Sequence, residues 1–329
     1  MSSLVLFKLL AIFVVVAVGW VVGTLKWLGP ATDGSDPART LSNAAYFIFV
    51  PALLFRTTAR IEFGTMPWGT LAAIFVPMSA MLLAVYAVQR RANRSGALPV
   101  AAPSVRAISS VFGNTVQVGI PMAAALFGET GLAIHLAIVS VHALTLLTLS
   151  TALVELDLAR AQRLEGGPPK RLGATLVSTV RNTVIHPVVL PVLIGLTWNL
   201  LGLPLPGLAD DILQTLGQAV VPLCLVLIGM SLAYGGVQGA LASAVCRSIL
   251  KLLVLPALVL AVARWGFDLS GLPLAVVVMM AALPIGSNAL MFAQRYRALE
   301  AETSTATVIS TFAFVATAPF WLAVLHGLA

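Results

Sequence analysis

Two short stretches of an otherwise apolar sequence combine helix-breaking residues with side-chain amides and hydroxyls. Residues 113–121 read GNTVQVGIP, and residues 284–288 read PIGSN. Proline removes a backbone donor and clashes with the preceding turn, and glycine weakens a helix further, so both stretches should interrupt a helix. Backbone groups freed inside a membrane must find partners in the protein or in a water-lined cavity. We therefore interpret the pair as a binding site.

The polar groups in these two stretches favour an anionic ligand. The side chains are uncharged and belong to Asn114, Thr115, Gln117, Ser287 and Asn288. Each helix that restarts after an interruption presents an N-terminus with partial positive charge. A carboxylate could accept hydrogen bonds from the amides of Asn114 and Asn288 in that field. A single kink is common in membrane helices and needs no function, so the argument depends on there being two.

Composition and hydropathy predict the helices that must position these residues. Of 329 residues, 59% are hydrophobic and 9% charged, and the mean hydropathy is +1.00, which excludes a soluble enzyme. Two cysteines exclude a disulfide framework. Apolar runs of about 20 residues predict an all-α protein with ten transmembrane helices. We expect the spans at residues 3–25, 40–58, 67–89, 104–128, 130–155, 180–202, 211–234, 241–265, 272–294 and 303–327.

Basic residues cluster between the spans and indicate their orientation. With the N-terminus outside, all 19 Lys and Arg residues fall on the cytoplasmic side except Lys8, Arg56, Arg60 and Arg264. Both termini then face the outer, periplasmic side of what we expect to be a bacterial inner membrane. This placement explains the net charge of +7 without a nucleic-acid partner. Lys251, at the start of the eighth span, is interpreted as one of these cytoplasmic charges.

The longest polar break predicts two halves of opposite orientation. Residues 158–173 form a cytoplasmic linker between residues 1–157 and 174–329, with five spans in each half. An odd number of spans per half inverts the second half, as in an inverted repeat. A shift of 171 residues carries residues 114–121 onto 285–292, which overlap the second interruption.

The spans also lack groups that other functions need. All 12 Asp and Glu residues fall in loops or near span ends, which argues against a cation transporter and excludes an aspartyl intramembrane protease. His135 and His142 lie seven residues apart and share a helix face. They are either proton carriers or packing groups that hydrogen-bond to neighbouring helices. No motif predicts a cofactor or a metal site.

The sequence resembles the auxin efflux carrier family, which includes the plant PIN carriers and bacterial malonate-permease-like proteins. The resemblance covers nearly the whole chain and rests on VPALLF at 50–55, GNTVQVGIP at 113–121, LIGLTWNL at 193–200, PLCLVLIGMSL at 222–232 and AALPIGSNALMFAQRY at 281–296. The family motifs are matched by Asn114, Gly119, Pro121, Pro284 and Gly286. Ser287 and Asn288 look like the bacterial branch, because the plant carriers have apolar residues and a second proline here. His186 and Pro187 stand where the family usually has Asn-Pro.

The resemblance implies a secondary active transporter with ten helices in two inverted repeats. Helices 1, 2, 6 and 7 would form a scaffold, and helices 3–5 and 8–10 a transport domain that moves like an elevator. The broken helices 4 and 9 would cross at their prolines beside the substrate, a mono- or dicarboxylate that is malonate-like or auxin-like. A homodimer through the scaffold is plausible, and the coupling ion would be a proton or sodium. The alternatives are a sodium-coupled symporter of the bile-acid type, and an intramembrane enzyme or non-transporting sensor.

Overall fold

The computed structural model describes residues 3–30, 37–60, 68–164, 189–234 and 241–328. Within these ranges the chain is helical, and the only β pairing is a single antiparallel bridge between Gly113 and Ile285. The α-helices are α1 (Ser3–Thr24), α2 (Pro37–Ala44), α3 (Val50–Ala59), α4 (Trp68–Ala92), α5 (Ala102–Val111), α6 (Ile120–Leu164), α8 (Val189–Leu200), α9 (Gly207–Gln218), α10 (Val220–Tyr234), α11 (Leu241–Ile249), α12 (Leu255–Ala261), α13 (Gly271–Ala281), α14 (Ser287–Arg295) and α15 (Glu300–Gly327).

Four wider π-helical segments and one 3₁₀ turn complete the regular structure. The π segments are η1 (Ala45–Phe49), η4 (Thr115–Gly119), η5 (Leu250–Val254) and η6 (Val262–Gly266), and the 3₁₀ turn is η3 (Asn93–Ser95). Segment η1 joins α2 to α3, and η5 joins α11 to α12. Such π-helical turns inside helices are frequently found at functional sites. Two of them, η1 and η4, contribute residues to the pocket described below.

Five helical stretches are long and apolar enough to cross a membrane. They are Trp68–Ser95, Thr115–Ala161, Gly207–Met230, Leu241–Gly266 and Glu300–Gly327. Shorter apolar helices lie at Val14–Thr24, Leu190–Leu200 and Gly271–Ala281. The predicted class, an all-α membrane protein, agrees with these lengths and compositions.

Some expected boundaries are wrong. Helix α6 continues to Leu164, so the start of the expected linker at residue 158 is helical. The expected break between the spans 104–128 and 130–155 is present, because Gly128 has a non-helical conformation (φ 65°, ψ −163°) at which two helices meet within α6. The expected span 211–234 consists of two helices, α9 and α10, that meet at Ala219. The rest of the linker and the pair His186-Pro187 lie outside the described residues.

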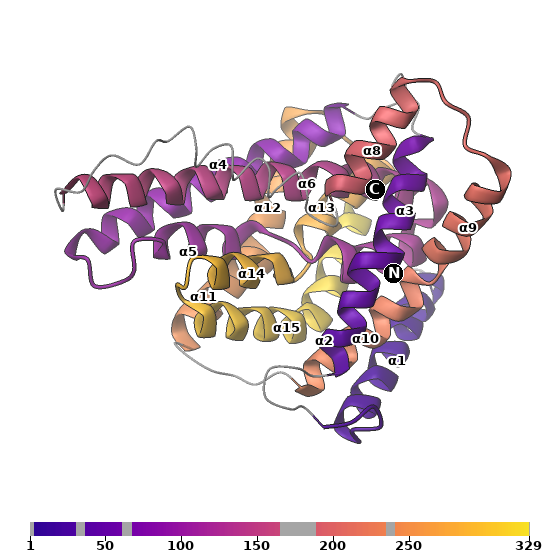
Figure 1. The fold of residues 1–329 in the computed structure, drawn as a ribbon, viewed down its shortest axis with the longest axis horizontal. Coiled ribbons are helices and arrows are strands. Elements are labelled where there is room, and N and C mark those ends of the chain that lie inside the picture. The colour runs from indigo at the N-terminus through magenta and orange to yellow at the C-terminus, as the bar shows by residue number, and fades with distance from the viewer. Residues whose placement is uncertain (1–2, 31–36, 61–67, 165–188, 235–240, 329) are drawn as a thin grey trace.

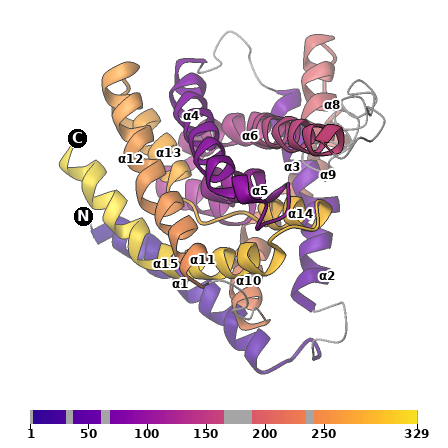
Figure 2. The ribbon, with the colours of Figure 1, turned by 90° about the vertical axis from the view of Figure 1, so that its left-hand side faces the viewer.

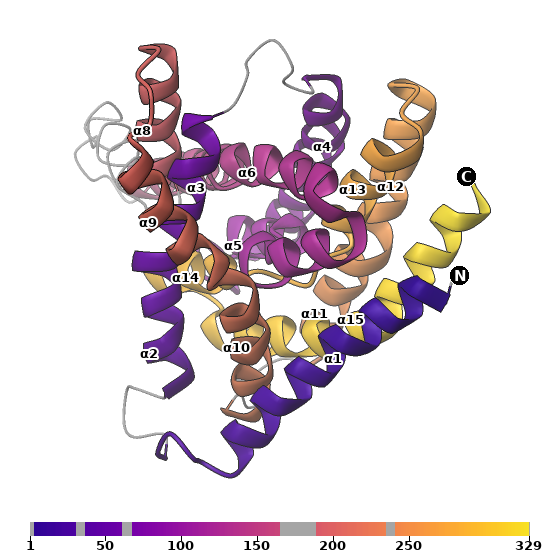
Figure 3. The same cartoon turned by 90° about the vertical axis from the view of Figure 1, so that its right-hand side faces the viewer.

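The helices gather on two sides of α6 (Figures 1, 2 and 3). On one side α1 packs along α10, and α3 packs against α8 and α9. On the other side α4 packs against α5 and α12, and α11 packs against α15. Helix α6 contacts members of both groups, including α3, α8, α5 and α13. Figure 3 shows α6 lying between α8 and α13.

A largely buried ion pair orients the helix before the first interruption against two neighbouring helices. Arg106 of α5 donates to both carboxylate oxygens of Glu302 in α15, each at 2.9 Å. Ser243 of α11 donates to the same carboxylate at 2.5 Å. Paired N–H donors match a carboxylate in direction as well as charge, so this contact sets the relative orientation of α5, α11 and α15.

Candidate functional site

The two interrupted helices meet where their helical turns stop. Helix α5 ends at Val111, and the chain is extended at Phe112 before η4 begins at Thr115. The backbone N–H of Asn114 donates to the carbonyl of Pro284 at 2.8 Å. The backbone N–H of Gly286 donates to the carbonyl of Phe112 at 3.0 Å. Each interruption therefore supplies the backbone partners that the other has lost, as burial away from water requires.

Close backbone contact explains the glycine in the second interruption. A Cβ at Gly286 would lie 2.7 Å from the carbonyl oxygen of Gly113, closer than such atoms approach. The neighbouring N–H of Ile285 donates to the hydroxyl of Ser310 in α15 at 3.0 Å. The meeting point is thus held from three helices, and only a residue without a side chain fits at position 286.

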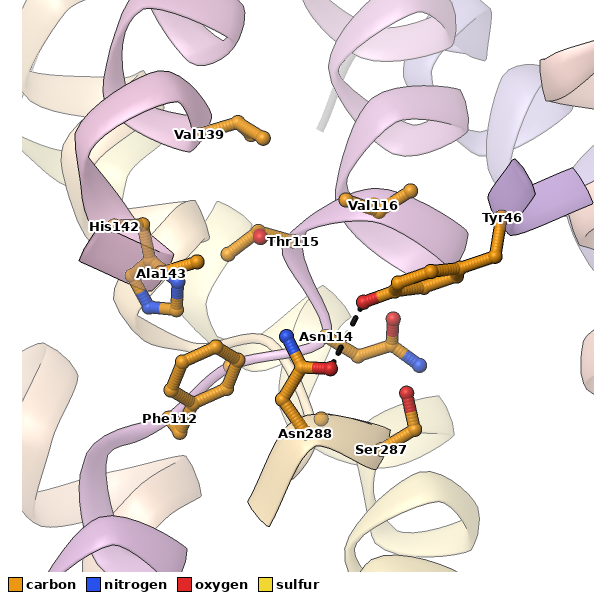
Figure 4. A pocket seen from close by; sticks show the side chains of 12 residues that line it. Tyr46, Phe112, Asn114, Thr115, Val116, Val139, His142, Ala143, Ser287 and Asn288 are labelled. Atoms are coloured by element: carbon orange, nitrogen blue, oxygen red, sulfur yellow. Dashed lines mark hydrogen bonds between the residues drawn. The ribbon is translucent and has the colours of Figure 1, made fainter. Parts of the chain in front are cut away.

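A pocket opens beside this meeting point, where η4 and α14 begin (Figure 4). Its walls come from the two interruptions, from η1 and from α6. The lining residues are Tyr46, Phe112, Gly113, Asn114, Thr115, Val116, Val139, His142, Ala143, Gly286, Ser287 and Asn288. The lining contains no carboxylate. The pocket therefore combines two helix N-termini with neutral polar side chains, a setting that favours a negatively charged group.

Asn288 presents hydrogen-bond donors to the pocket. Its side-chain carbonyl oxygen accepts from the hydroxyl of Tyr46 at 2.9 Å, which fixes which end of the amide faces that ring (Figure 4). Among the described residues, its NH₂ group has no acceptor, and the hydroxyls of Ser287 and Thr115 are likewise unpartnered. These groups are available to a ligand, although Asn288 is only 6% exposed.

Asn114 has a different role from its counterpart in α14. Its side-chain oxygen accepts the backbone N–H of Gln117 at 3.1 Å and so caps the start of η4. Its NH₂ group donates to the side-chain oxygen of Gln117 at 3.3 Å, and the amide of Gln117 reaches Ser42 of α2 at 3.4 Å. Gln117 therefore supports Asn114 from behind and does not line the pocket.

The two histidines differ in their surroundings. Nε2 of His135 lies 2.8 Å from the carbonyl oxygen of Thr115, and its ring packs against Gly119. His142 is 1% exposed, lines the pocket and packs against the ring of Phe112, with centroids 4.4 Å apart. Within the described part of the chain, Nε2 of His142 has no hydrogen-bond partner. His135 thus binds the backbone carbonyl of Thr115, whereas Nε2 of His142 is left to bind a ligand or a proton.

One prediction about charge is wrong. Lys251 is completely buried and does not sit at a cytoplasmic surface. It lies in η5, and its ammonium donates to the carbonyl of Ala281 at 2.5 Å, where α13 ends. The expected span and the observed helix both begin at residue 241, so Lys251 lies ten residues inside the span, at the meeting point, and not at its cytoplasmic start.

Comparison with known proteins gives the context for this geometry. Residues 4–322 match the family described as membrane transport proteins, in which the auxin efflux carriers are found. The chain belongs to this family. It is also 27% identical to an uncharacterized transporter of Methanothermobacter thermautotrophicus over 326 residues, which cover 96% of this chain and 97% of that protein. Family and relative indicate an integral membrane transporter and not an enzyme.

The structure of this family member brings most of the expected site residues together. Asn114, Thr115, Gly286, Ser287 and Asn288 all line the pocket. The expected crossing at both prolines is only half right. Pro284 takes part in the backbone contact, whereas Pro121 is the second residue of α6 and is not a partner in the backbone bonds between the interruptions. Gly119 faces His135 in a second cavity.

Tyr46 is a polar pocket residue that sequence reasoning missed, as it missed the apolar lining residues Phe112, Val116, Val139 and Ala143. Tyr46 lies in η1, inside the expected second span, and reaches the pocket from the other group of helices. A lone tyrosine in an apolar span carries a hydroxyl that needs a partner, and that was the available signal. Without knowing which helices face each other, the sequence could not name Asn288 as the partner.

Proposed function

We propose that this protein is a secondary active transporter of a small organic anion, a mono- or dicarboxylate of the malonate or auxin type. The observation that carries the proposal is the convergence of two restarting helices on one pocket without a carboxylate. Asn114 caps the first of them, and Asn288 lies in the first turn of the second. A carboxylate in this pocket would gain the field of both helix ends and the free donors of Ser287 and Asn288.

The proposed movement is an elevator of one helix group against the other. The expected scaffold corresponds to α1, α2–α3, α8 and α9–α10, and the transport domain to the remaining helices of two inverted repeats. Two polar contacts link the groups at the site, Tyr46 with Asn288 and Gln117 with Ser42. Both are single hydrogen bonds between uncharged groups, which cost little to break when the site moves. The scaffold would also form the homodimer interface, with both termini on the periplasmic side of a bacterial inner membrane.

Proton coupling is assigned to His142 within this proposal. Its ring lines the pocket and its Nε2 is unused, so a proton gained there would sit beside the bound anion. His135 is engaged with the Thr115 carbonyl and serves as a structural group.

Transport by the purified protein tests the proposal. Proteoliposomes on a solid support would be challenged with malonate, malate, succinate, 2-oxoglutarate and indole-3-acetate, with pH and sodium varied independently. Because electroneutral exchange carries no current, radiolabelled counterflow would accompany the recordings. One acid should give a saturable signal that Asn114→Ala and Asn288→Ala abolish while both proteins still fold. Gln218→Ala, an exposed position in α9, is the control.

Two results would contradict the proposal. Absence of saturable counterflow with every acid would reject the substrate class. Normal transport by both asparagine variants would reject the site.

A further inference from the structure

Lys251 places a cationic side chain at the meeting point of the interrupted helices. It is 0% exposed and belongs to Leu241–Gly266, one of the stretches long enough to cross a membrane. Its ammonium lies against the first interruption as well as the second, because a Cβ at Gly113 would be 3.4 Å from Nζ. An ionisable residue buried within a membrane span is costly and is by default a candidate for function.

No acidic side chain neutralises Lys251 in the described part of the chain. It forms no ion pair there, and its one hydrogen bond is to the carbonyl of Ala281. Glu302 of α15, a helix that packs against α11 and η5, is already paired with Arg106 and accepts a hydrogen bond from Ser243. Arg247, one turn earlier, is itself a buried cation, and the titratable group on the α6 side is His142. The neighbouring side chains therefore add positive charge and do not balance it.

The end of a broken helix supplies the balancing charge. Helix α13 stops at Ala281, so within the described residues the Ala281 carbonyl has no backbone donor in a following turn and accepts from Lys251 instead. This carbonyl lies at the negative end of the helix dipole, where a cation is favoured. The π turn η5 is held beside it by Trp321, whose indole N–H donates to the Leu252 carbonyl at 2.8 Å. The chain thus holds the ammonium at the C-terminal carbonyl of α13.

We propose that the Lys251 ammonium is a built-in cation at the meeting point of the interrupted helices, because it lies at a helix C-terminal carbonyl of the kind that coordinates a mobile sodium ion or proton in transporters with discontinuous helices. The inference has one consequence that rests on the proposed transport function: transport should proceed without a sodium ion bound at the meeting point of the interrupted helices. The charge is covalently attached, so it accompanies the site in both of its positions. Lys251 does not line the pocket. It stabilises the backbone at the meeting point, which in turn positions the groups that would bind the anion, so Lys251 is a positioning residue.

Thermal stability of the purified, substrate-free protein tests the inference. Wild type, Lys251→Met and Lys26→Met would be compared in choline, sodium and methylammonium chloride at one ionic strength. Lys26 is an exposed lysine after α1 and controls for loss of one positive charge. The Tm of wild type and Lys26→Met should not depend on the cation. Lys251→Met should melt several degrees lower in choline and recover in a saturable manner with sodium or methylammonium.

Two outcomes overturn the inference. One is saturable, sodium-specific stabilisation of the wild type, which would show a separate mobile cation site. The other is a Lys251→Met protein whose Tm in choline equals that of wild type and does not change with sodium or methylammonium. If Lys251→Met does not fold, the wild-type titration and Lys251→Arg, which keeps the charge and should remain indifferent to sodium, still decide the matter. None of these readouts uses substrate, so failure of the carboxylate assignment would be seen separately in the transport assay.

Discussion

The hydroxyl of Tyr46 donates to the side-chain oxygen of Asn288 at 2.9 Å, across the boundary between the two helix groups. This contact orients the amide so that its NH₂ group is left for the pocket. The residues are 242 positions apart in the chain, so the fold alone brings them together.

Tyr46→Phe tests the orienting role of that contact. The ring is kept and the hydroxyl lost, so the Asn288 amide can rotate and present its oxygen to the anion. A net hydrogen bond is worth about 1 kcal/mol, so KM for the transported acid should rise roughly 5-fold with little change in Tm. Tyr234→Phe, which removes a hydroxyl bonded to the Gly29 carbonyl, should leave KM unchanged. An unaltered KM in Tyr46→Phe would show that the amide is fixed by other means.

Asn288→Asp tests the charge preference of the pocket. The change keeps an acceptor for Tyr46 and nearly the same shape, but it removes the NH₂ donors and adds a negative charge beside the bound carboxylate. Uptake of the acid should fall at least about 10-fold, which corresponds to about 1.4 kcal/mol. Gln218→Glu makes the same chemical change at an exposed position in α9 and should transport normally. Equal uptake by both variants would argue against an anionic ligand at Asn288.

Gly286→Ala tests the close approach of the two interruptions. The added methyl group would meet the Gly113 carbonyl at 2.7 Å and force the backbones apart. Overpacking of this kind costs about 1–3 kcal/mol, so Tm should fall and transport should be lost. Gly69→Ala in α4, where a Cβ meets nothing within 4 Å, should keep or raise Tm. A Gly286→Ala protein as stable as wild type would mean that the crossing can widen freely.

Substitutions of His135 and His142 should have different effects, because His135 is assigned a structural role and His142 a role in proton coupling. His135→Leu leaves the Thr115 carbonyl without its donor and should lower the stability by about 1–3 kcal/mol, measured as a lower Tm. His142→Gln keeps a polar group of similar reach but cannot carry a proton. It should retain substrate exchange and lose uptake driven by an imposed pH gradient. Loss of gradient-driven uptake in a well-folded His135 variant instead would reverse the assignment.

Much of the fold follows from local sequence features. Apolar length predicts the helices, and the Gly and Pro residues near Asn114 and Asn288 predict where two of them break. These signals are local, because a proline or glycine acts on its own turn wherever the rest of the chain lies. The break at Gly128 is predicted in the same way, but the far end of α6 is misplaced, because the helix continues to Leu164 through the start of the polar stretch expected to be a linker.

The missing parts of the site depend on which helices face each other. Lys251 is interpreted as a cytoplasmic charge from its expected place at the start of a span, and that place says nothing of the carbonyl that accepts a hydrogen bond from its ammonium. Tyr46 could be recognised as a polar group in an apolar span, but its partner lies in the other half of the chain. Pairings of this kind are decided by packing, which a single sequence does not specify.

The mutual pairing of backbone groups at Gly113 and Ile285 has a consequence for the unloaded protein. If the bound substrate completed the hydrogen bonds of the broken helices, its release would leave backbone polar atoms unpaired inside the bilayer, at a cost of several kcal/mol for each. Here the N–H groups of Asn114 and Gly286 already donate to the carbonyls of Pro284 and Phe112 in the facing interruption. In the proposed transport cycle, the substrate-free protein would therefore keep its geometry after release, and the return step would not need a substrate to hold the two interruptions together.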